Sequence, residues 1–143
     1  MKPPGLRLLF LLALLGSTFG CADRGEGEAV VNEMFNAVKA KDYELASSYH
    51  AVTFLGGKTP KSDFLRDIKS FKENLGDLQS WKQVMWSIKE KRGTADSGTY
   101  YYFIYETTYS NGVAREGIRL HKPSRSEGSP QIVEHRIELD GVP

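Results

Sequence analysis

The sequence predicts an α+β domain in which N-terminal helices pack on a curved four-stranded antiparallel sheet. Between residues 31 and 75, apolar residues recur with the period of an α-helix, and from residue 79 onward they alternate with the period of a β-strand. Asn111-Gly112, a dipeptide typical of two-residue hairpin turns, separates two segments rich in aromatic and β-branched residues. Helices followed by consecutive strands are typical of the α+β class.

Three helices are expected in the first half of this domain. Asp42 is a suitable N-cap for a short second helix over residues 43–49, because its carboxylate can accept from free backbone N–H groups. Pro60 is a residue favoured in the first turn of a helix, and Gly76 is one favoured just after the last turn. They predict the limits of the third helix. The first helix has an apolar stripe formed by Val31, Met34, Phe35 and Val38.

Four strands are expected to follow. The first contains the alternating residues Val84, Trp86 and Ile88, which are expected to face the core. The second covers residues 99–109 and the third residues 113–122. After a polar loop over residues 123–130, the last strand covers residues 131–139. These strands predict a meander, in which each strand pairs with the next.

A turn at Asn111-Gly112 would pair Ser110 with Val113 and place Thr107 opposite Glu116. A slip of one residue would turn the arginines of the third strand into the core, which argues against it. In the fourth strand, one face carries Val133, His135, Ile137 and Leu139 and is expected to point inward. The other face, with Ile132, Glu134, Arg136 and Glu138, is expected to point outward. The core face of the hairpin is expected to carry Tyr101, Phe103, Tyr105, Thr107, Tyr109, Ala114, Glu116, Ile118 and Leu120.

The order of these elements resembles the nuclear-transport-factor-2-like (NTF2-like) superfamily, also called cystatin-like cones. The resemblance covers residues 28–139 and rests on the first helix, the segment KAKDYELASSY, the third helix from Pro60 and the hairpin YYYFIYETTYSNGVAREGIRL. It implies a sheet curved around the helices, with a pocket between them. Enzymes, binding domains and transport factors all use this fold, so the resemblance implies no particular function.

The predicted core face is apolar except for one polar row, formed by Thr107, Glu116 and His135. An unpaired ionisable group is costly to bury, so we expect Glu116 and His135 to contact each other. In one interpretation they form the polar end of a ligand cavity that Trp86 and Tyr105 also line, with Glu116 orienting His135 as an acid, base or donor. In the other they are a buried pair without a chemical role.

The other two histidines are not expected to belong to a functional site. His50 follows the second helix, where a cation would interact favourably with the negative end of the helix dipole, so we expect a capping role. His121 is expected to be solvated on the outer face of the sheet.

The outer sheet face is predicted to carry an aromatic patch that fits a protein interface, through which the chain would form a homodimer or bind another envelope protein. This patch is formed by Trp81, Met85, Tyr100, Tyr102 and Ile104.

The first twenty residues have the three parts of a secretory signal. Lys2 and Arg7 are the positive residues, and residues 8–15 form an apolar run. Thr18-Phe19-Gly20 then precedes Cys21. This segment resembles the lipobox of bacterial lipoproteins, in which Cys21 would carry the lipid. Thr18 departs from the Leu that is usual there, and Phe19 is bulky for its place; the alternative is an ordinary signal peptide cut nearby.

Three regions are therefore expected: a lipoprotein signal over residues 1–20, a tether over residues 21–28 and one cone-type domain over residues 29–143. The resemblance to lipoproteins implies that Ala22, after the cysteine, directs the protein to the outer membrane, where it would face the periplasm. The membrane is then a partner through the N-terminal lipid.

Composition excludes several classes of function. The chain has 143 residues and 19 basic side chains; without Lys2 and Arg7, 17 basic side chains remain against 18 acidic ones, which gives no electrostatic basis for nucleic-acid binding. A single cysteine allows no internal disulfide, and with three histidines it fits no familiar zinc-site spacing. No cofactor or metal is expected.

The sequence thus predicts a lipid-anchored envelope domain that binds a small apolar ligand or a protein partner without catalysis. The alternative is a small-molecule enzyme, isomerase-like or hydrolase-like, that uses Glu116 and His135.

Overall fold

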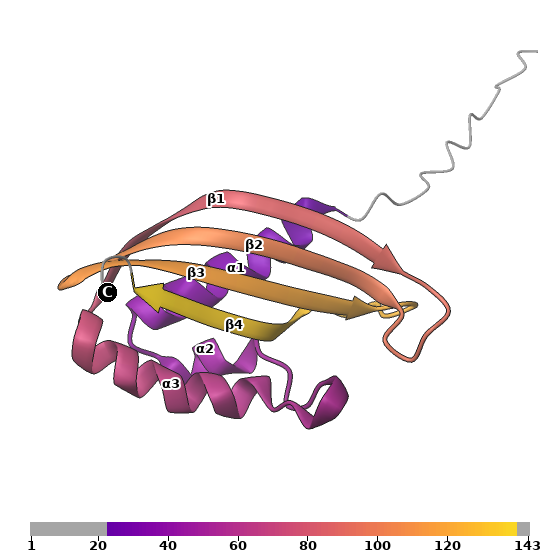
Figure 1. Ribbon diagram of the computed structural model, residues 1–143, viewed down its shortest axis with the longest axis horizontal. Coiled ribbons are helices and arrows are strands. Elements are labelled where there is room, and N and C mark those ends of the chain that lie inside the picture. The colour runs from indigo at the N-terminus through magenta and orange to yellow at the C-terminus, as the bar shows by residue number, and fades with distance from the viewer. Residues whose placement is uncertain (1–22, 140–143) are drawn as a thin grey trace, which may run out of the picture.

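Three α-helices precede a four-stranded antiparallel sheet in the computed structural model, which describes residues 23–139 (Figure 1). The sheet order is β1-β2-β3-β4, and every neighbouring pair is antiparallel. The curved sheet arches over the helices, so the predicted α+β class is confirmed. The elements are α1 (Arg24–Lys39), α2 (Tyr43–Ser48), the 3₁₀ turn η1 (Leu55–Gly57), α3 (Pro60–Leu75), β1 (Leu78–Lys91), β2 (Gly98–Tyr109), β3 (Gly112–Pro123) and β4 (Gln131–Leu139).

Helix α1 begins earlier than the sequence predicts. Asp23 caps it, because a side-chain oxygen accepts from the Gly25 N–H at 2.9 Å. The segment 24–28 was expected to be part of a tether, but it forms the first turns of this helix. Its polar residues bind the sheet: Arg24 Nη2 donates to Gln83 at 2.8 Å, and Tyr101 donates to Glu26 at 3.1 Å. These tertiary contacts favour helix where composition alone indicates a linker.

Helices α2 and α3 form where the sequence predicts them. Asp42 caps α2 by accepting from the Leu45 N–H at 3.0 Å. Pro60 occupies the start of α3, and Gly76 ends it with φ of 77° and ψ of −145°. L-residues rarely adopt this conformation, so a glycine is needed there.

The concave side of the sheet is filled by side chains from α1. Met34 and Phe35 are almost fully buried, and the Phe35 ring lies 5.2 Å from the rings of both Trp81 and Tyr105. Burying a side chain of this size stabilises the fold by roughly 1.5–3 kcal/mol. Gly27 brings the helix against the sheet, since a Cβ there would lie 2.8 Å from a Tyr101 ring carbon. The inside of the cone is therefore a packed core.

The β2–β3 hairpin has the predicted core face but a different register. Tyr109 pairs with Gly112, so the turn residues are Ser110 and Asn111 and not Asn111-Gly112. The pairing differs from the predicted one by two residues, which preserves the face to which each side chain points. All nine hairpin residues predicted to face the core are buried. The turn is held from outside: the Ser110 N–H donates to the Asp77 carbonyl and the Asn111 N–H to the Leu75 carbonyl.

Irregular pairing in the two outer strands changes which residues face inward. The β1–β2 register shifts between Gln83 and Met85, so Val84 is about half exposed and not in the core as predicted. In β4 the register shifts beside Arg119 and Leu120, and Ile132, predicted to face outward, is fully buried opposite Leu120. A bulge adds a residue to one strand and reverses the alternation beyond it.

Candidate functional site

The polar row predicted for the core face lies at the boundary between β3 and β4. His135 Nε2 is 2.7 Å from Glu116 Oε2. The other carboxylate oxygen of Glu116 accepts from Thr107 Oγ1 at 2.9 Å and from the Tyr109 hydroxyl at 2.6 Å. Glu116 is only 1% exposed, so its carboxyl group depends on these neighbours for its hydrogen bonds. The structure thus places Thr107, Glu116 and His135 together.

His50 extends this row, and it was not predicted to be part of it. Its Nε2 lies 3.3 Å from His135 Nδ1, and its Nδ1 lies 3.1 Å from the Ala46 carbonyl oxygen. The residue was expected to be a cation at the end of α2, but it is 2% exposed. Burial, and then the neighbouring His135, lower the pKa of His50 to about 3. His50 therefore caps α2 through the Ala46 carbonyl, as expected, but it does so as a neutral imidazole near neutral pH and not as the expected cation.

The hydrogen bonds assign the proton positions in this row. A carbonyl only accepts, so Nδ1 of neutral His50 carries the hydrogen and its Nε2 accepts from His135. A single proton then lies between His135 Nε2 and Glu116 Oε2: either an imidazolium donates to a carboxylate, or a carboxylic acid donates to an imidazole. Burial and Glu116 raise the pKa of Tyr109, which therefore remains a donor.

The side of the row that faces the helices is covered by Phe64 of α3. Its ring stacks on His50, with 4.2 Å between centroids, and lies parallel to the ring of His135 at 5.7 Å. A hollow of about 10 Å³, lined by His135 and residues of α3, adjoins the row, and a shallow surface depression of about 310 Å³ lies outside it. Glu116 lines neither of them.

Two other residues predicted for the cavity lie elsewhere. Tyr105 is buried against Phe35, and burial raises the pKa of its hydroxyl to about 12. Trp86 is 48% exposed at the β1 edge, where the guanidinium carbon of Arg24 lies 4.7 Å from the centroid of its ring. The structure therefore does not bring Trp86 to the Glu116–His135 pair.

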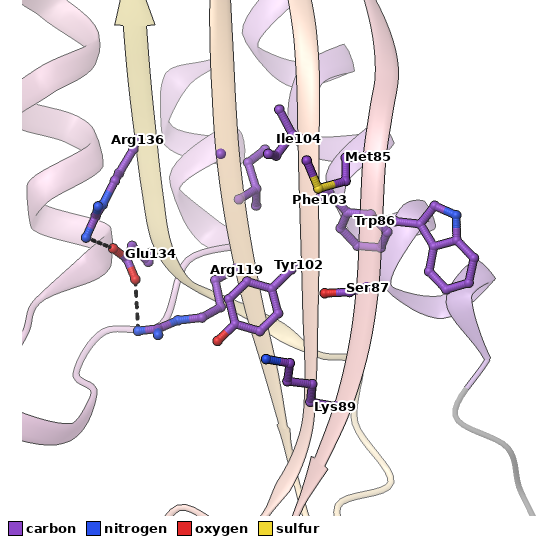
Figure 2. A pocket seen from close by; sticks show the side chains of 12 residues that line it. Met85, Trp86, Ser87, Lys89, Tyr102, Phe103, Ile104, Arg119, Glu134 and Arg136 are labelled. Carbon is purple, nitrogen blue, oxygen red and sulfur yellow. Dashed lines mark ion pairs between the residues drawn. The ribbon is translucent and has the colours of Figure 1, made fainter.

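The outer face of the sheet carries a groove of about 490 Å³ across all four strands (Figure 2). Met85 of β1 and Ile104 of β2 lie side by side on it, next to the ring of Tyr102. Gly117 of β3 leaves space in the groove, since a Cβ there would have no neighbour within 4 Å.

One border of this groove is charged. Glu134 of β4 lies between two arginines: its Oε2 is 2.9 Å from Arg119 Nη2, and its Oε1 binds Arg136 (Figure 2). Both Lys89 and Arg119 lie about 6 Å from the Tyr102 ring, near enough for weak cation–π contacts.

The outer-face patch predicted from the sequence is present in part. Met85, Tyr102 and Ile104 line the groove, and the first two are exposed. Trp81 is on the opposite face, because the bulge at Val84 reverses the alternation: its ring packs on Phe35 and its indole N–H donates to Asn32.

Tyr100 is on the predicted face but is covered. Its ring stacks on His121 at 4.5 Å, and Phe54, which precedes η1, packs on that imidazole. His121 was expected to be solvated but is buried, and burial lowers its pKa. The segment around η1 thus covers this end of the outer face.

The sequence did not predict that His50 contacts the polar row. It placed Tyr109 on the core face but did not identify it as a donor to Glu116. The signal that could have revealed His50 is its spacing from Ala46: four residues along a helix place a side chain beside the last free carbonyl groups. Nothing in the sequence shows that the end of α2 lies next to β4, where His50 forms a bridge with Ile132.

Within residues 23–139, no group of three or more His, Cys, Asp and Glu side chains converges as a metal site requires. Over the same part of the chain, no helix combines the length and the apolar character needed to cross a membrane. The predicted signal segment and Cys21 lie outside the described residues.

Comparison with solved structures identifies the fold alone. Bd1075 from Bdellovibrio bacteriovorus aligns with a TM-score of 0.52 at 13% identity, over 81% of this chain and 40% of that chain. Aln2 from a Streptomyces species aligns with a TM-score of 0.51 at 16% identity, over 81% of this chain and 89% of that chain. An NTF2-like protein of unknown function from Cytophaga hutchinsonii aligns with a TM-score of 0.43 at 14% identity, over 79% of this chain and 88% of that chain.

The chain thus spans less than half the length of Bd1075. No protein-family model matches this chain, and no curated protein does.

Proposed function

We propose that this protein is a lipid-anchored domain of the bacterial cell envelope that binds a protein partner on its open sheet face and has no catalytic role. The groove lined by Met85, Tyr102 and Ile104 is the observation that carries this proposal. Met, Tyr and Arg are enriched in protein interfaces, and here Arg119 lies near the ring of Tyr102 while Met85 lines the same groove.

Arg119 also gives the groove a charged side chain next to its aromatic one. Its Nη2 lies 2.9 Å from Glu134 Oε2, and its guanidinium carbon lies 6.0 Å from the centroid of the Tyr102 ring. A small apolar ligand inside the cone has less support, because Phe35, Phe103 and Tyr105 occupy that space.

The membrane anchor in this proposal is Cys21. A thioether-linked diacylglycerol and an N-acyl chain would bury three acyl chains, each methylene contributing about 0.8 kcal/mol, and two chains already give stable attachment. The resemblance to lipoproteins, with Ala22 after the cysteine, supports the outer membrane as its location. Palmitate labelling of the wild type and of Cys21→Ser tests the anchor: equal labelling of both, or labelling of neither, would contradict it.

The alternative function, a small-molecule enzyme, is supported by the contact of Glu116 with His135. That contact is saturated, however: both oxygens of Glu116 and both nitrogens of His135 are engaged with other protein groups. An acid or base must reach the proton that it transfers. The pair therefore fits a structural role better, and a loss of stability without loss of binding in Glu116→Gln and His135→Gln would agree with it.

Site-specific photocrosslinking in living cells tests the binding surface. A photoreactive residue replaces Met85 or Tyr102 in the groove, and Lys69, exposed on α3, is the matched control position. We expect adducts of one defined mass at both groove positions and none at the control. The mass separates a second copy of this chain from another envelope protein. Equal labelling at all three positions, or none, would overturn the proposal.

A further inference from the structure

The N-terminus of α1 is rigidly joined to the sheet. Tyr101 and Lys122 both bind the carboxylate of Glu26, and Lys122 Nζ lies 2.5 Å from it. The next residue, Gly27, lies so close to the sheet that a Cβ would clash with the Tyr101 ring. Helix α1 begins beside the part of the sheet where β1 and β3 end (Figure 1). The start of α1 and the sheet therefore form one rigid unit, and the orientation of Asp23 fixes the orientation of the domain.

The chain leaves little freedom between this fixed point and the proposed anchor. Cys21 precedes Asp23 by two residues. Two extended residues span at most about 7 Å, so a lipid on Cys21 would hold the surface around Asp23 against the bilayer. A tether of eight residues, as the sequence suggested, would have left the orientation open.

The surface next to Asp23 has the chemistry of a membrane interface. Trp86 projects from the β1 edge with nearly half of its surface exposed, and the Arg24 guanidinium lies over its ring. An aromatic ring with one apolar and one polar end is suited to the boundary between headgroups and acyl chains. Glu26, in the first turn of the same helix, borders a separate hollow of about 330 Å³. Its other charged residues are Glu90, Lys91, Arg92, Lys122 and Arg125. Lys122 is paired with Glu26, Arg92 with Glu90 and Lys91 with Asp96.

We propose that this surface, formed by Trp86, Arg24 and the basic hollow around Lys122, is the face with which the protein contacts phospholipid headgroups. The inference rests on the proposed lipid anchor at Cys21. Four basic side chains against Glu26, Glu90 and Asp96 leave one positive charge at the hollow, which fits the phosphates of anionic lipids. Trp86 also lines the outer-face groove, so with this face on the membrane the β1 side of the groove lies next to the headgroups (Figure 2).

Tryptophan fluorescence of the mature, lipidated protein in vesicles tests this contact. The vesicles contain phosphatidylethanolamine and phosphatidylglycerol, with or without bromine near the top of the acyl chains, since bromine quenches nearby indoles. The chain has two tryptophans, Trp81 and Trp86. We expect bromine to reduce the fluorescence of the wild type and to leave that of Trp86→Phe unchanged, because Trp81 lies against Phe35 and away from the bilayer.

A matched control moves the reporter to the other end of the domain. Asn74→Trp in the Trp86→Phe background places an exposed indole near the end of α3, and it should not be quenched. Failure of the anchor is recognised separately, because the protein would then lack palmitate and would not float with the vesicles. A lipidated protein that floats but shows no quenching of Trp86, or equal quenching of the Asn74→Trp reporter, would overturn the inference.

Discussion

His135 Nε2 lies 2.7 Å from Glu116 Oε2, although the two residues are not directly opposite in the sheet. Glu116 pairs with Ile137, and His135 pairs with Ile118, so the contact is diagonal across β3 and β4. Long side chains reach such diagonal neighbours in an antiparallel pair. The contact closes a polar row from the Ala46 carbonyl to the Tyr109 hydroxyl inside an otherwise apolar core.

Replacing Glu116 should destabilise the fold in proportion to the hydrogen bonds lost. Glu116→Leu leaves His135, Thr107 and Tyr109 without their common acceptor, and we expect it to lower the free energy of unfolding by about 3–5 kcal/mol. Glu116→Gln keeps an acceptor for the hydroxyls and should cost about 1–3 kcal/mol. Urea unfolding measures both, with the exposed Glu106→Gln as a control near zero. A Leu variant as stable as the wild type would contradict the structural role.

Acid should weaken the fold through His50. Its pKa is about 3 in the folded chain and 6.5 ordinarily, so between these values the unfolded chain binds a proton that the folded chain does not. The free energy of unfolding should therefore fall as the pH decreases through this window, by up to about 1.4 kcal/mol per pH unit from this group. It should not fall further from this cause below about pH 3.

Urea unfolding at several pH values, compared between the wild type and His50→Gln, isolates this effect from the carboxylates that titrate in the same range. We expect a smaller loss of stability on acidification in the variant. Lys69→Gln, at an exposed position on α3, serves as a control and should keep the pH profile of the wild type. Identical pH profiles for the wild type and His50→Gln would refute the assignment of a neutral His50.

The core face of the hairpin could be predicted because a register error of two residues leaves every side chain on the same face of the sheet. The predicted pairing of Thr107 with Glu116 is displaced by two residues, yet both side chains remain inside. Their contact with His135 was predicted for the same reason, since His135 lies beyond the β4 irregularity and keeps the expected face. Local periodicity was sufficient wherever the strands pair regularly.

The remaining features depend on contacts between distant segments. The turn at Ser110 and Asn111 is held by carbonyls of Asp77 and Leu75, and these bonds select a pairing that the Asn111-Gly112 motif does not indicate. The irregularity at Val84 moves Trp81 to the helix side, where Phe35 provides a partner. The alternation of apolar and polar residues within one strand does not indicate which distant residues will contact it.

Replacing Gly76 by alanine should destabilise the fold more than the same change at Gly93, although the two glycines have the same φ. In Gly76→Ala, the new Cβ would lie 2.0 Å from Ser110 Oγ, in addition to the backbone strain at φ of 77°. Strain and steric overlap together should lower the free energy of unfolding by about 2–5 kcal/mol. Gly93→Ala has the same φ but no neighbour within 4 Å, and should cost only about 1–2 kcal/mol. Equal losses would show that the contact with the hairpin turn is unimportant.

A large side chain at Gly117 should fill the groove and block binding of the partner without destabilising the fold. A Cβ at this position would meet no atom within 4 Å, and the groove has room for a ring beyond it. A glycine inside a strand is itself unfavourable, so Gly117→Phe should keep the stability or raise it by about 0.5–1 kcal/mol. The ring would occupy the space beside Ile104 and Arg119 where the partner is proposed to bind. We therefore expect photocrosslinking from Met85 to be lost while the protein remains folded. Thr108→Phe, on the same sheet face but outside the residues that line the groove, should leave crosslinking intact; undiminished adducts in Gly117→Phe would exclude the groove as the binding surface.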